Sequence, residues 1–157
     1  MNKHTWKPYA FWILLTEAVG ALSGLLSRGG MAIFSSIVQP PFSPPAIVFP
    51  IVWGILYALM GISAARIYLS PPSQARNRGL NLYIAQLIVN FFWSLIFFNA
   101  QAFGFAFLWL LLLWVLVLWM ILTFRKVDPL AAWLQIPYLI WLTFAAYLNL
   151  GVWILNC

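Results

Sequence analysis

Long runs of apolar residues, separated by short polar segments, dominate this sequence. Five of them approach or exceed the roughly 20 residues that an α-helix needs to cross the hydrocarbon core of a bilayer. They are Tyr9–Ser27, Ala46–Leu69, Leu80–Asn99, Phe103–Leu122 and Leu130–Leu155. The runs are continuous rather than alternating, and they are far longer than the ~10-residue strands of a membrane β-barrel. The pattern therefore predicts an all-α fold, an integral membrane bundle of five transmembrane helices.

Composition supports lipid as the solvent of this bundle. Of the 157 residues, 65% are hydrophobic and 6% are charged, whereas a soluble domain carries about 25% charged residues. The segments between the apolar runs are short, and no linker or internal repeat is visible. We therefore predict a single transmembrane domain over residues 1–157.

The basic residues predict how the bundle is oriented. Five predicted spans place almost all of them on one side of the membrane: Lys3, Lys7, Arg66, Arg76, Arg78, Arg125 and Lys126. Arg28 alone falls on the other side. Because cytoplasmic loops hold the excess of lysine and arginine, we expect a cytoplasmic N-terminus and an extracytoplasmic C-terminus. The lack of a visible targeting segment favours a bacterial inner membrane over a mitochondrial one as the expected location.

The first apolar run has a second interpretation. Lys3 and Lys7 followed by apolar residues are also typical of a signal peptide, although Glu17 would then interrupt its hydrophobic part. Glu17 is the single acid within a predicted span. An ionisable residue there indicates a functional role, and a protonated or hydrogen-bonded carboxyl near the interface is the structural alternative.

Few residues can support catalysis. His4 is the only histidine and Cys157 the only cysteine, so a His/Cys metal cluster and an intramolecular disulfide are excluded. A Ser-His-Asp or Cys-His set is not expected either, because His4 lies near the N-terminus, where chains are poorly ordered. Gly20 and Gly24 form a G-x-x-x-G pair, which permits close helix packing. That packing would lie either inside one bundle or between the two copies of a homodimer.

Three of the spans place aromatic residues beside polar or small ones at helical spacing. The groups are Trp53 and Tyr57; Gln86, Asn90 and Trp93; and Pro137, Trp141, Ala145 and Asn149. Amide side chains in lipid are costly unless they are hydrogen-bonded, so we expect them to point inward with their aromatic neighbours. The result is either a packed core or an aromatic-walled pocket suited to a planar hydrophobic ligand.

Three segments also carry a family resemblance. They read QPPFSPPAIVFPIVW at 39–53, QLIVNFFW at 86–93 and PYLIWLTFAAYLN at 137–149. In order and spacing they resemble the KPxWxPPxxxFxxxW, QLxxNxxW and PYxxWxxFAxxLN patterns of the translocator proteins or tryptophan-rich sensory proteins, the TspO/MBR family. The chain departs from the family pattern at Gln39 and Phe42, and Ile33-Phe34 replaces a tryptophan-tyrosine pair.

The resemblance implies a loop that closes over a ligand site, and it implies which ligands the site takes. The lid residues would be Pro40, Pro41, Phe42, Pro44 and Pro45. The ligand contacts carry over onto Trp53, Tyr57, Asn90, Trp93, Pro137, Trp141 and Ala145. Expected ligands are porphyrins such as protoporphyrin IX or haem, and also sterols and isoquinoline or benzodiazepine-type drugs. No cofactor is required for this binding.

Three functions follow as hypotheses from the resemblance. The favoured one is a porphyrin-binding membrane protein that acts in sensing or stress regulation. A transporter of porphyrins or other hydrophobic metabolites is the second, although internal repeats and coupling charges other than Glu17 are missing. The third is an enzyme that degrades bound porphyrin in light, with Trp53 and Trp141 as oxidisable groups beside the macrocycle.

Overall fold

The computed structural model describes residues 6–34, 36–45 and 47–156, so Lys3, His4, Ala46 and Cys157 lie outside it. The described residues form helices and loops without any strand. Five helical spans are long and apolar enough to cross a membrane, which confirms the predicted all-α membrane bundle. The elements are α1 (Trp6–Leu26), α2 (Arg28–Phe34), α3 (Val48–Tyr68), α4 (Gln74–Ser94), the π-helix η1 (Leu95–Asn99), α5 (Phe103–Val127) and α6 (Pro129–Leu155).

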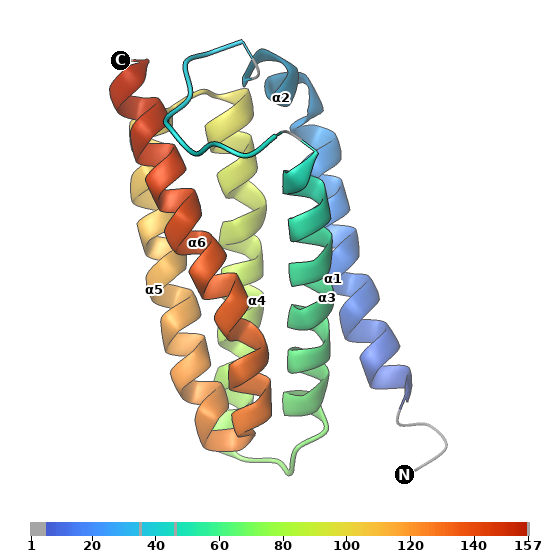
Figure 1. The fold of residues 1–157 in the computed structure, drawn as a ribbon. Helices are drawn as coiled ribbons and strands as arrows, with labels where there is room; N and C mark the ends of the chain where they lie inside the picture. Colours follow the sequence, from blue (N-terminus) through green and yellow to red (C-terminus); the bar gives the residue numbers. More distant parts are fainter. Residues whose placement is uncertain (1–5, 35, 46, 157) are drawn as a thin grey trace.

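The five long helices stand side by side (Figure 1), and their contacts form a ring. Helix α1 packs on α3, α3 on α6, α6 on α5 and α5 on α4, and contacts between α4 and α1 complete the ring. Helix α1 begins at the end of the bundle opposite to the one where α6 ends. Side chains that point to the ring interior therefore come from several helices that are far apart in the sequence.

Polar caps lengthen two helices beyond their apolar runs. Helix α4 begins at Gln74 rather than at the predicted Leu80, because the extended Ser73 accepts a 3.1 Å hydrogen bond from the Arg76 N–H. Asp128 caps α6 in the same way, accepting from the N–H of Leu130 at 3.3 Å. A serine or aspartate oxygen satisfies an N–H group that the first helical turn leaves without a partner.

The short helix α2 was not predicted from the apolar pattern. It packs on η1 at the far end of α4. At Gly30 a Cβ atom would lie 2.3 Å from the carbonyl oxygen of Phe98, so only glycine allows this close approach. Asn99 adds a 2.8 Å hydrogen bond from its Nδ2 to the carbonyl of Leu26. These contacts hold the α1–α2 turn against the π-helix.

Glycine also sets the distance between α1 and α3. A Cβ atom at Gly61 would lie 2.5 Å from the Cα of Ile13, and one at Gly20 would lie 2.1 Å from the ring of Tyr57. Gly24, in contrast, has no atom within 4 Å of the place where its Cβ would stand. Within the G-x-x-x-G pair, Gly20 therefore serves packing inside the bundle, where it makes room for Tyr57.

Candidate ligand site

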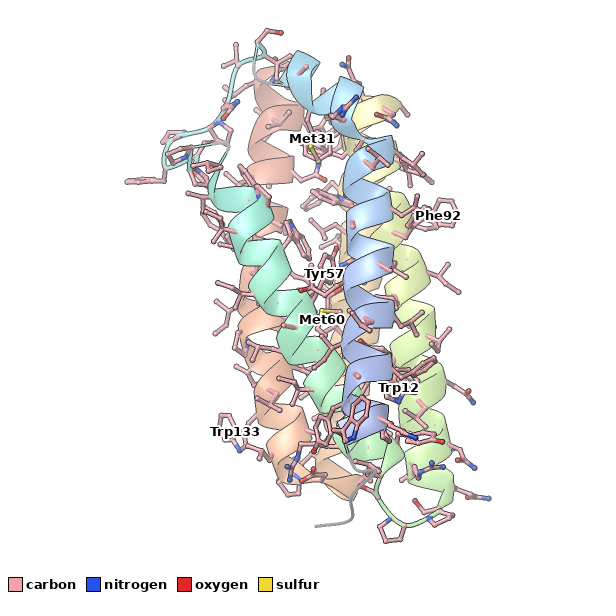
Figure 2. The ribbon with its side chains drawn as sticks, turned by 90° about the vertical axis from the view of Figure 1, so that its right-hand side faces the viewer. Trp12, Met31, Tyr57, Met60, Phe92 and Trp133 are labelled. Carbon is pink, nitrogen blue, oxygen red and sulfur yellow. The ribbon has the colours of Figure 1, made fainter. Side chains whose placement is uncertain are left out.

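Four aromatic side chains from α3 and α6 meet inside the ring of helices. We call them the aromatic cluster: Trp53, Tyr57, Tyr138 and Trp141. Trp53 stacks on Tyr57 with ring centroids 5.4 Å apart and planes 26° from parallel. It meets Tyr138 at 6.2 Å and Trp141 at 6.3 Å, both edge to face. Figure 2 shows Tyr57 pointing from α3 toward the middle of the bundle, whereas Trp133 points outward from α6.

A chain of hydrogen bonds runs along the inner edge of the aromatic cluster. The Tyr57 hydroxyl donates to Asn90 Oδ1 at 2.9 Å, and Asn90 Nδ2 donates to the Tyr138 hydroxyl at 2.7 Å. Tyr138 in turn donates to Gln86 Oε1 at 2.8 Å. All four side chains are buried. The prediction that Gln86 and Asn90 point inward is confirmed. The bonds satisfy the Asn90 amide and Gln86 Oε1, whereas Gln86 Nε2 is buried without a hydrogen-bond partner among the described residues.

Trp93 lies in a second group closer to η1. Its Nε1 donates to Asn149 Oδ1 at 3.1 Å, and its ring stacks on Phe97 at 5.1 Å. Asn149 Nδ2 donates to the carbonyl of Phe103 at 2.8 Å. This arrangement ties the end of α4 to the start of α5 and the end of α6. The structure therefore places Trp93 beside a separate group and not within the aromatic cluster.

Pro137 lies on the exposed side of α6, and its neighbour Tyr138 takes the inward position. The residues predicted to share one face of this helix, Pro137, Trp141, Ala145 and Asn149, were chosen at a spacing of four. Each such step overshoots one helical turn by roughly 40°, so Pro137 and Asn149 are rotated apart by roughly 120°. Tyr138 could have been found from its spacing of three residues to Trp141, which places both on one face.

Trp141 carries a buried polar atom that no described residue satisfies. Its ring is half-buried and also contacts Phe49 and Phe144, with centroids 5.9 Å and 5.6 Å away. Its Nε1 has no hydrogen-bond partner. Ala145, one turn further along α6, is 7% exposed. An orphan N–H inside a native fold needs an explanation, and an acceptor on a bound ligand is one.

The proline-rich loop is fastened to the last turns of α6. The Tyr147 hydroxyl donates to the carbonyl of Pro41 at 2.7 Å. Asn156 exchanges two hydrogen bonds with the backbone of Val38, at 3.1 and 2.7 Å. Pro40 is buried, and a Cβ atom at Gly151 would lie 2.6 Å from the Pro40 ring. The loop thus crosses the end of the bundle where α6 ends and α3 begins (Figure 1).

The other predicted lid residues are more exposed than Pro40. Phe42 is 88% exposed and adopts a positive φ of 67°, so its ring points away from the bundle. Pro44 is half-buried, whereas Pro41 and Pro45 are exposed. The carbonyl of Pro45 accepts a 3.0 Å bond from the N–H of Val48 and so begins α3. The side chains of Ile33 and Phe34 lie outside what the structure describes.

Two hollows in the surface lie away from the aromatic cluster. One, of about 350 Å³, is lined only by apolar side chains of α1 and α4. The other, of about 360 Å³, lies between the start of α4 and the end of α5. Within the aromatic cluster the rings contact one another directly. A planar ligand that enters between them must move these rings apart.

The fold and the site define a multi-pass α-helical membrane protein whose buried amides and aromatic rings lie beneath a proline-rich loop. The chain belongs to the TspO/MBR family, whose sequence model matches residues 8–154. It is 36% identical over 151 residues to the Translocator protein of Ovis aries, covering 94% of this chain and 89% of the relative.

Bacterial relatives show similar identity. Protein CrtK of Rhodobacter capsulatus is 36% identical over 149 residues, which covers 94% of this chain and 92% of the relative. The Tryptophan-rich sensory protein of Cereibacter sphaeroides is 32% identical over 123 residues, which covers 78% of this chain and 76% of the relative. The resemblance found in the three sequence segments is thus confirmed over most of the chain.

Proposed function

We propose that this protein binds a porphyrin, or a similar planar hydrophobic ligand, in the aromatic cluster and acts in sensing or stress regulation. The observation that carries the proposal is the buried Nε1 of Trp141, which has no partner among the described residues. A buried N–H without an acceptor costs about 1–3 kcal/mol. A ligand carbonyl, carboxylate or ring nitrogen beside Trp141 would remove that cost.

The surrounding rings suit a flat ligand. Trp53 and Trp141 stand at 89° to each other, so a ligand that moves them apart would meet the face of one indole and the edge of the other. A macrocycle could stack on one of these rings while its rim accepts a bond from the other. Ala145 is buried one turn from Trp141 on the same helix, so a ligand that reaches the indole would lie against its small side chain.

The loop supports the proposal because it closes the same end of the bundle. Tyr147 and Asn156 hold the loop by side-chain hydrogen bonds to its backbone, which can break without unfolding a helix. The prolines restrict the loop when it is open as well as when it is closed, so closure costs less conformational entropy. Ligand entry is therefore proposed to follow release of the loop from α6.

A binding experiment tests the proposal directly. Purified protein in detergent is titrated with protoporphyrin IX, haem and a sterol, and binding is followed by quenching of tryptophan fluorescence. We expect porphyrin to bind, and Ala145→Leu to obstruct it at least about tenfold because the added atoms would stand where the ligand meets Trp141. Ala21→Leu, at an exposed position of α1, is the matched control. Equal porphyrin binding by both variants would refute the site.

The same preparation distinguishes binding from the two other functions that the family resemblance suggested. Light-dependent bleaching of bound protoporphyrin with formation of a new product, lost in Trp53→Phe, would favour degradation. Movement of porphyrin across sealed vesicles would favour transport. Stable binding in both assays, without product or net movement, supports a sensor.

We also propose a bacterial inner-membrane location with the N-terminus in the cytoplasm. The support is the bias of positive charge toward one side of the membrane: the last helical turn of α3 carries Arg66, and that of α5 carries Arg125 and Lys126. A reporter fused after Cys157 should be active outside the cytoplasm, and one inserted between α3 and α4 should be active inside it. The reverse pattern would overturn the orientation.

A further inference from the structure

A hollow of about 360 Å³ lies at the basic end of the bundle, where α4 begins and α5 ends. Its lining includes Ala75 and Arg78 of α4, and Trp119, Leu122 and Lys126 of α5. Arg78 and Lys126 are exposed at its rim. The hollow therefore combines two cations with an indole and an aliphatic wall.

These two cations have no protein anion to neutralise them. The whole sequence contains two acidic residues, Glu17 and Asp128. Asp128 pairs with Arg66 at 2.6 Å and also caps α6. Glu17 lies within the membrane-spanning part of α1. The counter-charge for Arg78 and Lys126 must therefore come from outside the chain.

The start of α4 adds positive potential to the same hollow. Ser73 satisfies the N–H of Arg76, but the N–H groups of Gln74 and Ala75 precede it in the first turn, where a helix leaves its donors without intrahelical partners. Both residues line the hollow. The positive end of the helix dipole thus lies beside the two cationic side chains.

The apolar wall extends from the charged rim toward the middle of the span. Trp119 precedes Lys126 by seven residues, which corresponds to roughly 10 Å along a helix. Trp119 is 51% and Leu122 49% exposed, although both side chains are large and hydrophobic. A ligand that fills the hollow therefore meets cations at one end and a hydrocarbon-like surface at the other.

We propose that this hollow binds an anionic phospholipid. Its phosphate lies between Arg78 and Lys126, and the first part of an acyl chain lies against Trp119 and Leu122. Basic sites between transmembrane helices recognise lipid head groups in this way. A soluble anion would use only the rim and leave the apolar wall uncovered, so the lipid fits the whole hollow better.

Native mass spectrometry of the full chain in detergent tests this proposal. The protein is offered phosphatidylglycerol and phosphatidylcholine with identical acyl chains. We expect wild type to retain phosphatidylglycerol preferentially, and the double variant Arg78→Gln/Lys126→Gln to bind it about 25-fold more weakly, at roughly fivefold for each charge removed. Arg125→Gln removes an exposed charge at the same end that does not line the hollow, and it should keep the preference.

Two further variants separate head-group binding from a general charge effect. The charge-retaining variant Arg78→Lys/Lys126→Arg should restore phosphatidylglycerol binding, and Trp119→Ala should weaken lipid binding several-fold while leaving any binding of inorganic phosphate unchanged. Circular dichroism checks that each variant is helical. Equal retention of the two lipids by wild type, or equal loss in Arg125→Gln and the double variant, would refute the site. Displacement of the lipid by millimolar inorganic phosphate would refute the lipid as its ligand.

Discussion

Trp141 offers the sharpest test of whether the aromatic cluster is a ligand site or only a packed core. Trp141→Phe keeps an aromatic ring but removes the buried Nε1, which has no partner in the described structure. Removing an unsatisfied N–H stabilises the fold by about 1–3 kcal/mol. The smaller ring loses contacts worth about 1–2 kcal/mol. The two effects nearly cancel, so we expect the free energy of unfolding to change by less than about 1 kcal/mol.

Ligand binding should respond differently to the same substitution. If Nε1 donates to a bound porphyrin, its loss removes one hydrogen bond, worth about 0.5–1.5 kcal/mol. The loss of ring area adds a similar amount, so the two losses together come to about 1–3 kcal/mol, and porphyrin affinity should fall about thirtyfold, with a range of roughly five- to 150-fold. A large loss of affinity with nearly unchanged stability is the signature of a ligand contact.

The assay measures both quantities on one preparation. Porphyrin affinity comes from fluorescence quenching, and stability comes from the melting temperature in detergent. Trp133→Phe is the matched control, because Trp133 is on the same helix, is 69% exposed and points outward in Figure 2. The control should change neither quantity. If Trp141→Phe melts far below wild type while its folded fraction binds porphyrin normally, Trp141 is a core residue and not a ligand contact.

Three further substitutions test the contacts around the aromatic cluster. Asn90→Ala should lower the free energy of unfolding by about 1–3 kcal/mol, because it leaves the Tyr57 hydroxyl without its 2.9 Å partner. In a double-mutant cycle with Tyr57→Phe the two losses should be less than additive, and strict additivity would argue against the hydrogen bond. Gly20→Val should displace the Tyr57 ring and lower both the melting temperature and porphyrin affinity, whereas Gly24→Val, with open space around it, should change neither. Equal effects of the two substitutions would contradict the close packing of Gly20 on Tyr57. Tyr147→Phe removes the hydrogen bond to the Pro41 carbonyl and should raise both the association and the dissociation rate of porphyrin in stopped-flow measurements. Unchanged rates would mean that the loop does not control ligand entry.

Much of the candidate site was visible in the sequence, because helical spacing and the cost of burying amides act locally. The amide positions Gln86 and Asn90 were predicted to face inward, and both are buried in one hydrogen-bonded chain. The sequence stripe on α6 named Pro137, whereas the structure places Tyr138 in that chain. Rotation errors of this size accumulate whenever a stripe is followed in whole steps of four residues.

Short elements and contacts between distant segments could not be predicted in the same way. Helix α2 has too few residues to show an apolar period, and its position depends on the approach of Gly30 to Phe98. The fastening of the loop to α6 depends on Tyr147 and Asn156, which are more than a hundred residues from their partners. Nothing in the local pattern of either partner indicates such a pairing.

The sequence by itself determined the solvent, the number of spans and the family, since apolar length and composition decide whether a helix can be stable in lipid. Only the tertiary structure decided which aromatic rings meet, which buried N–H groups stay without a partner, and where two uncompensated cations border a hollow. The physical reason is that insertion into the bilayer depends on each segment alone. Packing inside the ring depends instead on the fit between side chains from different helices, and lipid supplies no hydrophobic force to bring them together.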